Sequence, residues 1–114
     1  MTYQNSPYFA HYDHFSVSNS SDGYRLSLSS YTGTAGDEMT SWNNDFRFST
    51  WDKDRDGITG SCPVRNHGGW WYGACSGANP NGQWGGQYPT GVYWRQTTGY
   101  DSVDSIQMKI RTRL

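Results

Sequence analysis

The sequence predicts an α+β fold in which a small antiparallel sheet and one or two short helices are joined by a long irregular loop region. Aromatic residues make up 17% of the chain, half of its 33% hydrophobic content, and there are 14 glycines. This composition favours strands and loops over helices. A chain of 114 residues can bury only about two-thirds of its unfolded surface, so a covalent staple would help. We therefore expect one small domain over residues 1–114.

The first predicted strand lies within residues 23–33. Tyr24, Leu26 and Leu28 alternate there with polar residues, and a Thr-Gly pair follows. Alternation with a period of two is typical of a strand with one buried face.

The remaining predicted elements are weaker. Residues 37–42 predict one short helix, and a strand should follow with Phe46 and Phe48 facing inward. Between residues 52 and 89, glycine, asparagine and proline recur every few positions, so backbone groups there need partners other than a sheet ladder. A closing strand is predicted from the apolar residues near the C-terminus, which are Val103, Ile106, Met108 and Ile110.

The charge pattern argues against nucleic-acid binding and membrane insertion. The formal net charge is -1, without a basic run, so the sequence lacks an electrostatic footprint for nucleic acid. No apolar run is long enough to span a membrane, and the polar start "MTYQNSPYFAHYDHF" does not resemble a signal peptide. We expect a mature, truncated or fragmentary chain.

Cys62 and Cys75 are the only cysteines. There is no C-x-x-C spacing and no further soft ligand nearby, so the pair favours an intrachain disulfide over a metal or redox site. Such a disulfide would stabilise the fold by roughly 3 kcal/mol and would place the protein in an oxidising compartment, as a secreted protein. The sequon at Asn19 fits that location, although a polar turn explains it equally well.

The segment "DKDRDG" places Asp52, Asp54 and Asp56 two residues apart, followed by glycine. In a looped backbone this spacing turns hard oxygen ligands toward one point, which is a calcium pattern. It is not an EF-hand, because Pro63 occupies the position of the bidentate glutamate and neither flank is helical. A solvated acidic turn, relieved by the neighbouring basic residues, is the alternative.

The sequence does not indicate an enzyme. It has no nucleophile elbow, and His67 lies beside two glycines, where a histidine more often fixes a loop than acts as a base. His11 and His14 give only a weak zinc signal.

Four segments together resemble the fibrinogen C-terminal globular domain, the module of fibrinogen chains, ficolins, tachylectins, angiopoietins and tenascins. They are "NNDFRFSTWDKDRD", "CPVRNHGGWWYGAC", "ANPNGQW" and "SIQMKIR". The resemblance covers the sequence from Ala10 onward. A complete module is longer, so this sequence resembles its C-terminal half, without the N-terminal subdomain and that subdomain's additional cysteine pair.

The resemblance implies a calcium ion held by the carboxylates of Asp54 and Asp56 and by the backbone carbonyls of Ile58 and Gly60. Asp52 would brace the loop rather than bind the ion. The calcium ion and the disulfide would together order the irregular loop region.

The resemblance also implies a cis peptide bond between Ala74 and Cys75, and a ligand pocket next to it. Acetyl-binding members hold the acetyl methyl against aromatic rings, with a histidine and a tyrosine where this sequence has Ser76 and Asn66. Tyr88 matches a tyrosine of that pocket, whereas core packing is the expected role of at least one of the paired tryptophans at 70 and 71. The candidate ligand-binding residues are Asn66, His67, Trp71, Tyr72, Ala74, Cys75, Ser76, Trp84 and Tyr88.

These expectations describe a secreted, calcium-dependent recognition module, first of all a lectin of innate defence that binds acetylated or other glycans. The alternative is a module that binds a protein receptor or a matrix partner, because "ACSGANPNG" resembles the angiopoietin version of this stretch. A fragment without autonomous function is a third possibility. An oligomer is expected in a full-length context.

Overall fold

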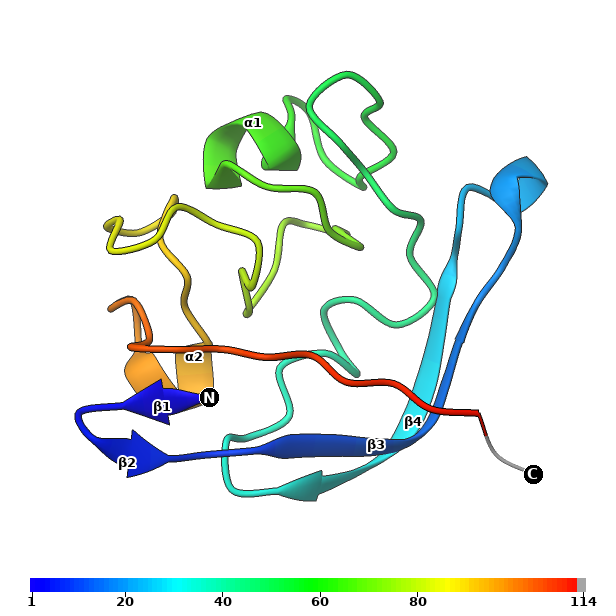
Figure 1. The fold of residues 1–114 in the computed structure, drawn as a ribbon. Coiled ribbons are helices and arrows are strands. Elements are labelled where there is room, and N and C mark those ends of the chain that lie inside the picture. Colours follow the sequence, from blue (N-terminus) through cyan, green and yellow to red (C-terminus); the bar gives the residue numbers. More distant parts are fainter. Residues whose placement is uncertain (113–114) are drawn as a thin grey trace.

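The computed structural model describes residues 1–112, and its ribbon is drawn in Figure 1. Two short two-stranded antiparallel sheets form, one from β1 and β2 and one from β3 and β4. The elements in sequence order are β1 (Thr2–Tyr3), β2 (Ser6–Pro7), β3 (Ala10–Val17), the 3-10 helix η1 (Ser20–Asp22), β4 (Leu26–Gly33), α1 (Cys62–Asn66) and α2 (Arg95–Thr98). The predicted α+β class, with a long irregular region, is therefore confirmed.

Strands β3 and β4 form a hairpin closed by η1. The side chain of Asn19 accepts a hydrogen bond from the backbone N–H of Ser21 and so caps η1. Gly23 ends η1 with φ 66°, a left-handed conformation that glycine adopts without strain. The turn sets a register in which Val17 lies opposite Leu26.

The hydrophobic core lies between this hairpin and the loop region. Leu26 and Leu28, predicted to point inward, are buried there, but Tyr24 is 46% exposed because it precedes β4 with φ 57°. Figure 1 shows the hairpin along one side of the molecule and the loops on the other. The core cluster consists of Leu26, Leu28, Ala35, Met39, Cys62, Trp70, Trp71, Tyr72, Cys75, Ala78 and Trp94.

The helix predicted over residues 37–42 is wrong. Asp37 Oδ1 accepts hydrogen bonds from the N–H groups of Met39 and Thr40 in the manner of a helix cap, and Asn43 N–H donates to the carbonyl of Met39. The backbone then leaves the helical path at Asp45, where φ is 72°. One turn forms, too little for a helix.

The strand predicted around Phe46 and Phe48 is also wrong. Phe46 is exposed and Phe48 half-buried, and the pairing of this segment is limited to single bonds such as Leu26 N–H to the Phe46 carbonyl. The segment runs antiparallel beside the start of β4, where the Asp45 N–H also donates to the Leu26 carbonyl and the Phe48 N–H to the Gly23 carbonyl, but these bonds do not form a continuous ladder.

The predicted closing strand does not form in the described residues. Val103 is buried and Ile106 half-buried, but Met108 and Ile110 are exposed. The segment meets β1 in one isolated bridge, between Thr2 and Ser105, so a continuous ladder has no second strand to build on.

Buried side-chain amides replace a sheet ladder in the loop region. Asn79 Nδ2 donates to the carbonyls of Asn66 and Gly91, each at 2.8 Å, and its Oδ1 accepts from the Tyr72 hydroxyl at 3.1 Å. Asn43 Nδ2 donates to the Trp71 carbonyl at 2.9 Å. These contacts satisfy backbone groups that would otherwise be buried without partners. Within residues 1–112, no helix has the length and apolarity needed to cross a membrane.

Candidate functional site

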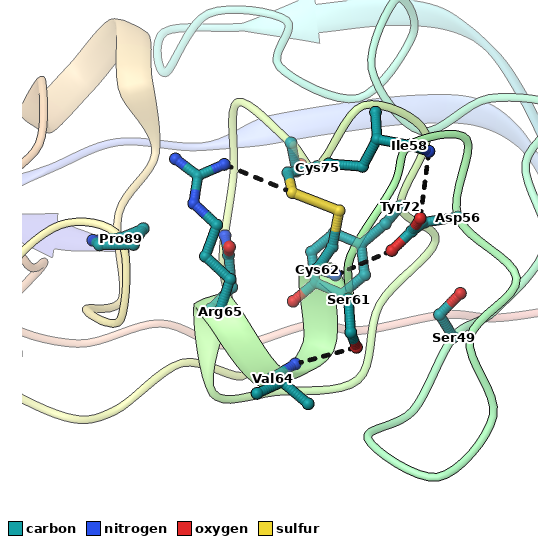
Figure 2. Close-up of a disulfide and its surroundings, with 12 residues drawn as sticks. Ser49, Asp56, Ile58, Ser61, Cys62, Val64, Arg65, Tyr72, Cys75 and Pro89 are labelled. Carbon is teal, nitrogen blue, oxygen red and sulfur yellow. Dashed lines mark hydrogen bonds between the residues drawn. A yellow bond between two sulfur atoms is a disulfide. The ribbon is translucent and has the colours of Figure 1, made fainter.

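Helix α1 and a disulfide organise the candidate site (Figure 2). The Ser61 hydroxyl accepts from the Val64 N–H at the start of α1, and His67 ends the helix with φ 60°. Cys62, the first residue of α1, forms a disulfide with Cys75, as predicted. Both sulfur-bearing residues are buried, so the loop between them is anchored to the core at both ends.

In the predicted calcium loop, the carboxylates of Asp54 and Asp56 accept hydrogen bonds from nearby backbone N–H groups. Asp54 Oδ1 accepts from the Asp56 N–H at 3.1 Å. Asp56 accepts from the Ile58 N–H through Oδ1 at 3.1 Å and from the Cys62 N–H through Oδ2 at 2.8 Å (Figure 2). Asp52 instead accepts from the Thr50 hydroxyl at 2.7 Å, and its expected role in bracing the loop stays a prediction.

The basic residues of this loop do not neutralise its aspartates. Arg55 directs its guanidinium to the Phe48 carbonyl at 3.0 Å, and no ion pair within residues 1–112 includes Asp54 or Asp56. The donor set is therefore two uncompensated carboxylates in a loop of backbone carbonyls, which suits a hard cation such as Ca²⁺. No group of three or more His, Cys, Asp or Glu side chains is placed to hold a metal in the described part, so Ca²⁺ would depend on those carbonyls.

The expected cis bond before Cys75 is wrong. Among the described residues the cis peptide bond joins Tyr88 and Pro89. Cys75 has φ 57°, a left-handed backbone that turns the loop back toward Cys62.

Four of the predicted ligand-binding residues are buried, namely Asn66, Trp71, Tyr72 and Cys75, and the two rings among them pack in the core. Trp71 is 8% exposed and packs edge-on against Phe48 and Trp70. Tyr72 is fully buried, and burial raises its pKa well above the usual tyrosine range. These residues support the loops from inside and do not line a pocket, which corrects the prediction. Trp70 is also buried, so the expected core role applies to both tryptophans.

Asn66 and Ser76 meet at the hydroxyl of Tyr93. Asn66 Nδ2 donates to that hydroxyl at 2.9 Å, and the hydroxyl donates to the Ser76 carbonyl at 3.3 Å. Burial raises the pKa of Tyr93 to about 12, so the hydroxyl keeps its proton. The Ser76 hydroxyl lies near the buried Asn43 amide, which donates to it at 3.0 Å.

Sequence reasoning missed Arg65 and Tyr100, which join Tyr88 in a surface that we call the arginine–tyrosine surface. Arg65 Nη2 donates to the Tyr88 hydroxyl at 2.9 Å, and Nη1 lies 3.5 Å from Cys75 Sγ. The rings of Tyr88 and Tyr100 are 4.2 Å apart. Arg65 lies in the segment "CPVRNHGGWWYGAC", but nothing in the local sequence indicates that its side chain reaches Tyr88.

A hollow of about 450 Å³ opens beside these rings. Its lining residues are Gly85, Gly86, Gln87, Tyr88, Tyr100, Asp101 and Ser102. Asp101 accepts a hydrogen bond from the Tyr3 hydroxyl at 2.7 Å. The surface therefore offers a cation, exposed rings and one engaged carboxylate.

The other predicted residues do not join this surface. His67 lines a separate hollow with Trp51 and Val64. Trp84 is 62% exposed, and Ala74 is exposed immediately before Cys75. Asn66, Cys75, Ser76 and Tyr88 are brought together, and His67 and Trp84 are not.

Comparisons with known proteins agree on one family. The family model for the C-terminal globular domain of the fibrinogen beta and gamma chains matches residues 2–113. Angiopoietin-related protein 6 of Homo sapiens is 51% identical over 96 residues, which is 79% of this chain and 20% of that protein. Tenascin-N of Mus musculus is 42% identical over 109 residues, 94% of this chain and 7% of that protein. The sequence thus spans only a small part of these relatives.

Solved structures give the same result. The fibrinogen-like globe domain of human ANGPTL6 has a TM-score of 0.81 and 44% identity, covering 90% of this chain and 49% of that one. A lamprey fibrin D-dimer, complexed with the peptide ligand Gly-His-Arg-Pro-amide, has a TM-score of 0.82 and 28% identity, covering 90% of this chain and 40% of that one. The fibrinogen-like globe fold is therefore shown.

Proposed function

Because this protein belongs to the fibrinogen C-terminal globular domain family, we propose that it is an extracellular, non-enzymatic recognition module that binds a protein partner. The arginine–tyrosine surface carries this proposal. Tyr88 and Tyr100 are 42% and 51% exposed, while α1, the disulfide and the buried Tyr93 fix the backbone beneath them. Exposed tyrosines and arginine on a rigid support are typical of protein interfaces.

The structural relative from lamprey fibrin supports a peptide or protein ligand, since it is complexed with a peptide. Angiopoietin-related proteins and tenascins among the similar proteins agree with the resemblance of residues 74–82 to the angiopoietin version. These proteins also support an extracellular location, as does the disulfide.

Ca²⁺ is part of the proposal as a structural ion. Asp54 and Asp56, with the carbonyls of Ile58 and Gly60, would hold it, and the bound charge would offset two carboxylates that no basic side chain neutralises. Asp56 also accepts from the Cys62 N–H, so the loop is coupled directly to the disulfide and to α1. Calcium would therefore help to order the recognition surface.

Acetylated glycans suit the site less well than a protein does. Trp71 and Tyr72 are buried, and the Ser76 hydroxyl accepts from the Asn43 amide and the Ala78 N–H. Of the rings predicted to bind a glycan, Tyr88 and Trp84 are the exposed ones. Lectin activity remains a prediction that can be tested directly.

The protein can be screened with Ca²⁺ against two arrays, one of cell-surface receptor ectodomains and matrix proteins, and one of glycans that include N-acetylglucosamine. We expect binding to a protein that a chelator abolishes and free N-acetylglucosamine does not compete. Tyr100→Ala should weaken this binding, whereas Trp84→Ala, a matched loss of an exposed ring, should not. Binding confined to N-acetylated glycans would replace this proposal with the lectin.

A further inference from the structure

We infer that the arginine–tyrosine surface selects an acidic segment of its partner, with an aspartate or glutamate carboxylate paired to Arg65. This inference rests on the proposed function and adds the chemistry of the ligand. It follows from the charge that Arg65 leaves uncompensated, from the fixed position of its guanidinium and from the groups around it.

Arg65 differs from Arg25 and Arg47 in having no acidic partner. Those two arginines both pair with Asp22, at 3.2 and 3.5 Å. No ion pair in the described residues includes Arg65, whose acceptors are the neutral Tyr88 hydroxyl and Cys75 Sγ. An exposed guanidinium with only neutral partners leaves a positive charge for a ligand to neutralise.

The guanidinium is also held in place before any ligand arrives. It is bonded to Tyr88 at 2.9 Å and lies 5.6 Å from the centre of that ring, while Cys75 approaches it from the disulfide (Figure 2). A guanidinium has five N–H donors in a planar fork that matches a carboxylate. Because its position is fixed, pairing with a carboxylate costs little further side-chain entropy.

The groups around Arg65 indicate where the carboxylate of a bound segment would lie. Asp101 lies in the hollow beside Tyr88 and Tyr100, where it would repel a second carboxylate. The acidic group must therefore sit at the Arg65 side, with the apolar part of the segment against the rings. A basic peptide such as Gly-His-Arg-Pro-amide would bring like charge to Arg65, so it should be a poor ligand here.

A blocked pentapeptide with one central glutamate, Ac-Gly-Gly-Glu-Gly-Gly-amide, tests the inference against the same peptide with glutamine. Titration of the isotopically labelled protein, followed by NMR at the Arg65 Nε–H and the Tyr88 ring, should show saturable shifts with the glutamate peptide. Affinity should be about tenfold weaker with glutamine, because a hydrogen bond to a charged carboxylate is roughly twice as strong as one to a neutral amide oxygen. Equal shifts with both peptides, or none with either, would overturn the inference.

Arg65→Gln should remove the preference for glutamate. Lys109→Gln, which deletes the same charge from an exposed residue elsewhere, should keep it, and Arg65→Lys should retain part of it because an ammonium lacks the planar fork. Unchanged melting temperatures would show that the variants are folded. Equal loss in Arg65→Gln and Lys109→Gln would reduce the effect to net charge and overturn the inference.

Two further experiments are needed. One distinguishes an acidic peptide from an acidic glycan as the ligand, and the other tests the acidic preference separately from the protein-binding function. Shifts at Arg65 with glucuronic acid but not with the glutamate peptide would assign the surface to an acidic glycan and overturn the inference. If an array partner binds the parent and Arg65→Gln equally, the acidic preference is wrong while the recognition function stands. If the glutamate peptide binds through Arg65 but the protein array is silent, the carboxylate preference stands and the protein-binding function fails.

Discussion

At the scale of single residues, the question is whether the carboxylates of Asp54 and Asp56 bind a cation. Each accepts a backbone N–H two residues ahead, so the loop curls around both carboxylates without an added cation. Backbone donors lower the cost of holding a charge, but two like charges in one short loop still repel each other. A bound divalent ion would remove that repulsion.

We therefore expect Ca²⁺ to raise the melting temperature and a chelator to reverse the rise. Asp54→Ala should abolish the calcium-induced shift, because it removes one of two carboxylate ligands. Asp22→Ala, which breaks exposed ion pairs with Arg25 and Arg47, should keep the shift whatever its own stability. Scanning calorimetry with and without Ca²⁺ measures the melting temperature of each variant. A full calcium-induced shift in Asp54→Ala would exclude this site.

Glu38 is a second residue with an electrostatic cost. It is 3% exposed, and its Oε2 is buried without a hydrogen-bond partner. Burial raises the pKa of Glu38, an effect that Gln96 and Arg95 only partly oppose. A raised folded-state pKa means that its contribution to stability is present at low pH and is lost as the pH rises through that pKa.

Glu38→Gln should consequently stabilise the protein at about pH 7 relative to the parent, and the advantage should shrink toward about pH 4, where the parent's carboxyl is protonated. The gain should be on the order of 1–3 kcal/mol, the cost of burying an unsatisfied polar group. Urea unfolding of both proteins at the two pH values measures the difference, in which the other titrating groups cancel. A difference that does not change with pH would contradict it.

At the scale of elements, the disulfide and α1 form one unit. A five-residue helix is too short to be stable alone, so α1 depends on the Ser61 cap and on Cys62. The bond to Cys75, 13 residues further along, anchors the segment that supports Arg65.

Replacing both cysteines with alanine should lower the free energy of unfolding by about 3 kcal/mol, the value expected for a loop of this size. The recognition surface should also loosen, which would appear as faster amide exchange at Arg65 than in β4. Mass mapping without reduction checks the bond itself. Two free thiols in protein secreted from oxidising compartments would contradict the pairing.

The two long strands show why the sequence predicted some elements and not others. In β4 the inward positions shift from Leu28 to Tyr31, past Ser30 with φ 63°, but the first two leucines alternate clearly enough to indicate a strand. In β3 the inward residues shift from Tyr12 to Phe15, opposite the same distortion. That shift breaks the period of two, so β3 was not predicted.

Some features of the candidate site could likewise be predicted from the sequence, and others could not. The aspartate spacing and the cysteine pair lie within short segments and could be recognised from sequence. The contact of Arg65 with Tyr88 spans 23 residues, and the burial of Trp71 and Tyr72 depends on the hairpin packing over them. Such contacts depend on the folded protein and leave no local pattern.

At the scale of the molecule, the described part is flat, with extents of 41 × 38 × 19 Å. Its accessible surface of 6833 Å² exceeds the roughly 6,300 Å² typical of a monomer of this mass. One core nevertheless joins both parts, since Leu26 and Leu28 of the hairpin share a cluster with Trp70 and Cys75 of the loop region. The hairpin and the loop region therefore share this core.

This single core predicts one cooperative unfolding transition. Far-ultraviolet circular dichroism, which follows the backbone of the hairpin, and tryptophan fluorescence, dominated by the buried rings at 70, 71 and 94, should melt together. A chelator should move both curves by the same amount, because the loop of Asp56 is bonded to Cys62 in the core. Trp51→Phe, which removes a ring that is 78% exposed, should change the fluorescence intensity without separating the curves. Two resolved transitions would mean that the hairpin and the loop region unfold independently, and calcium would then stabilise only the loops.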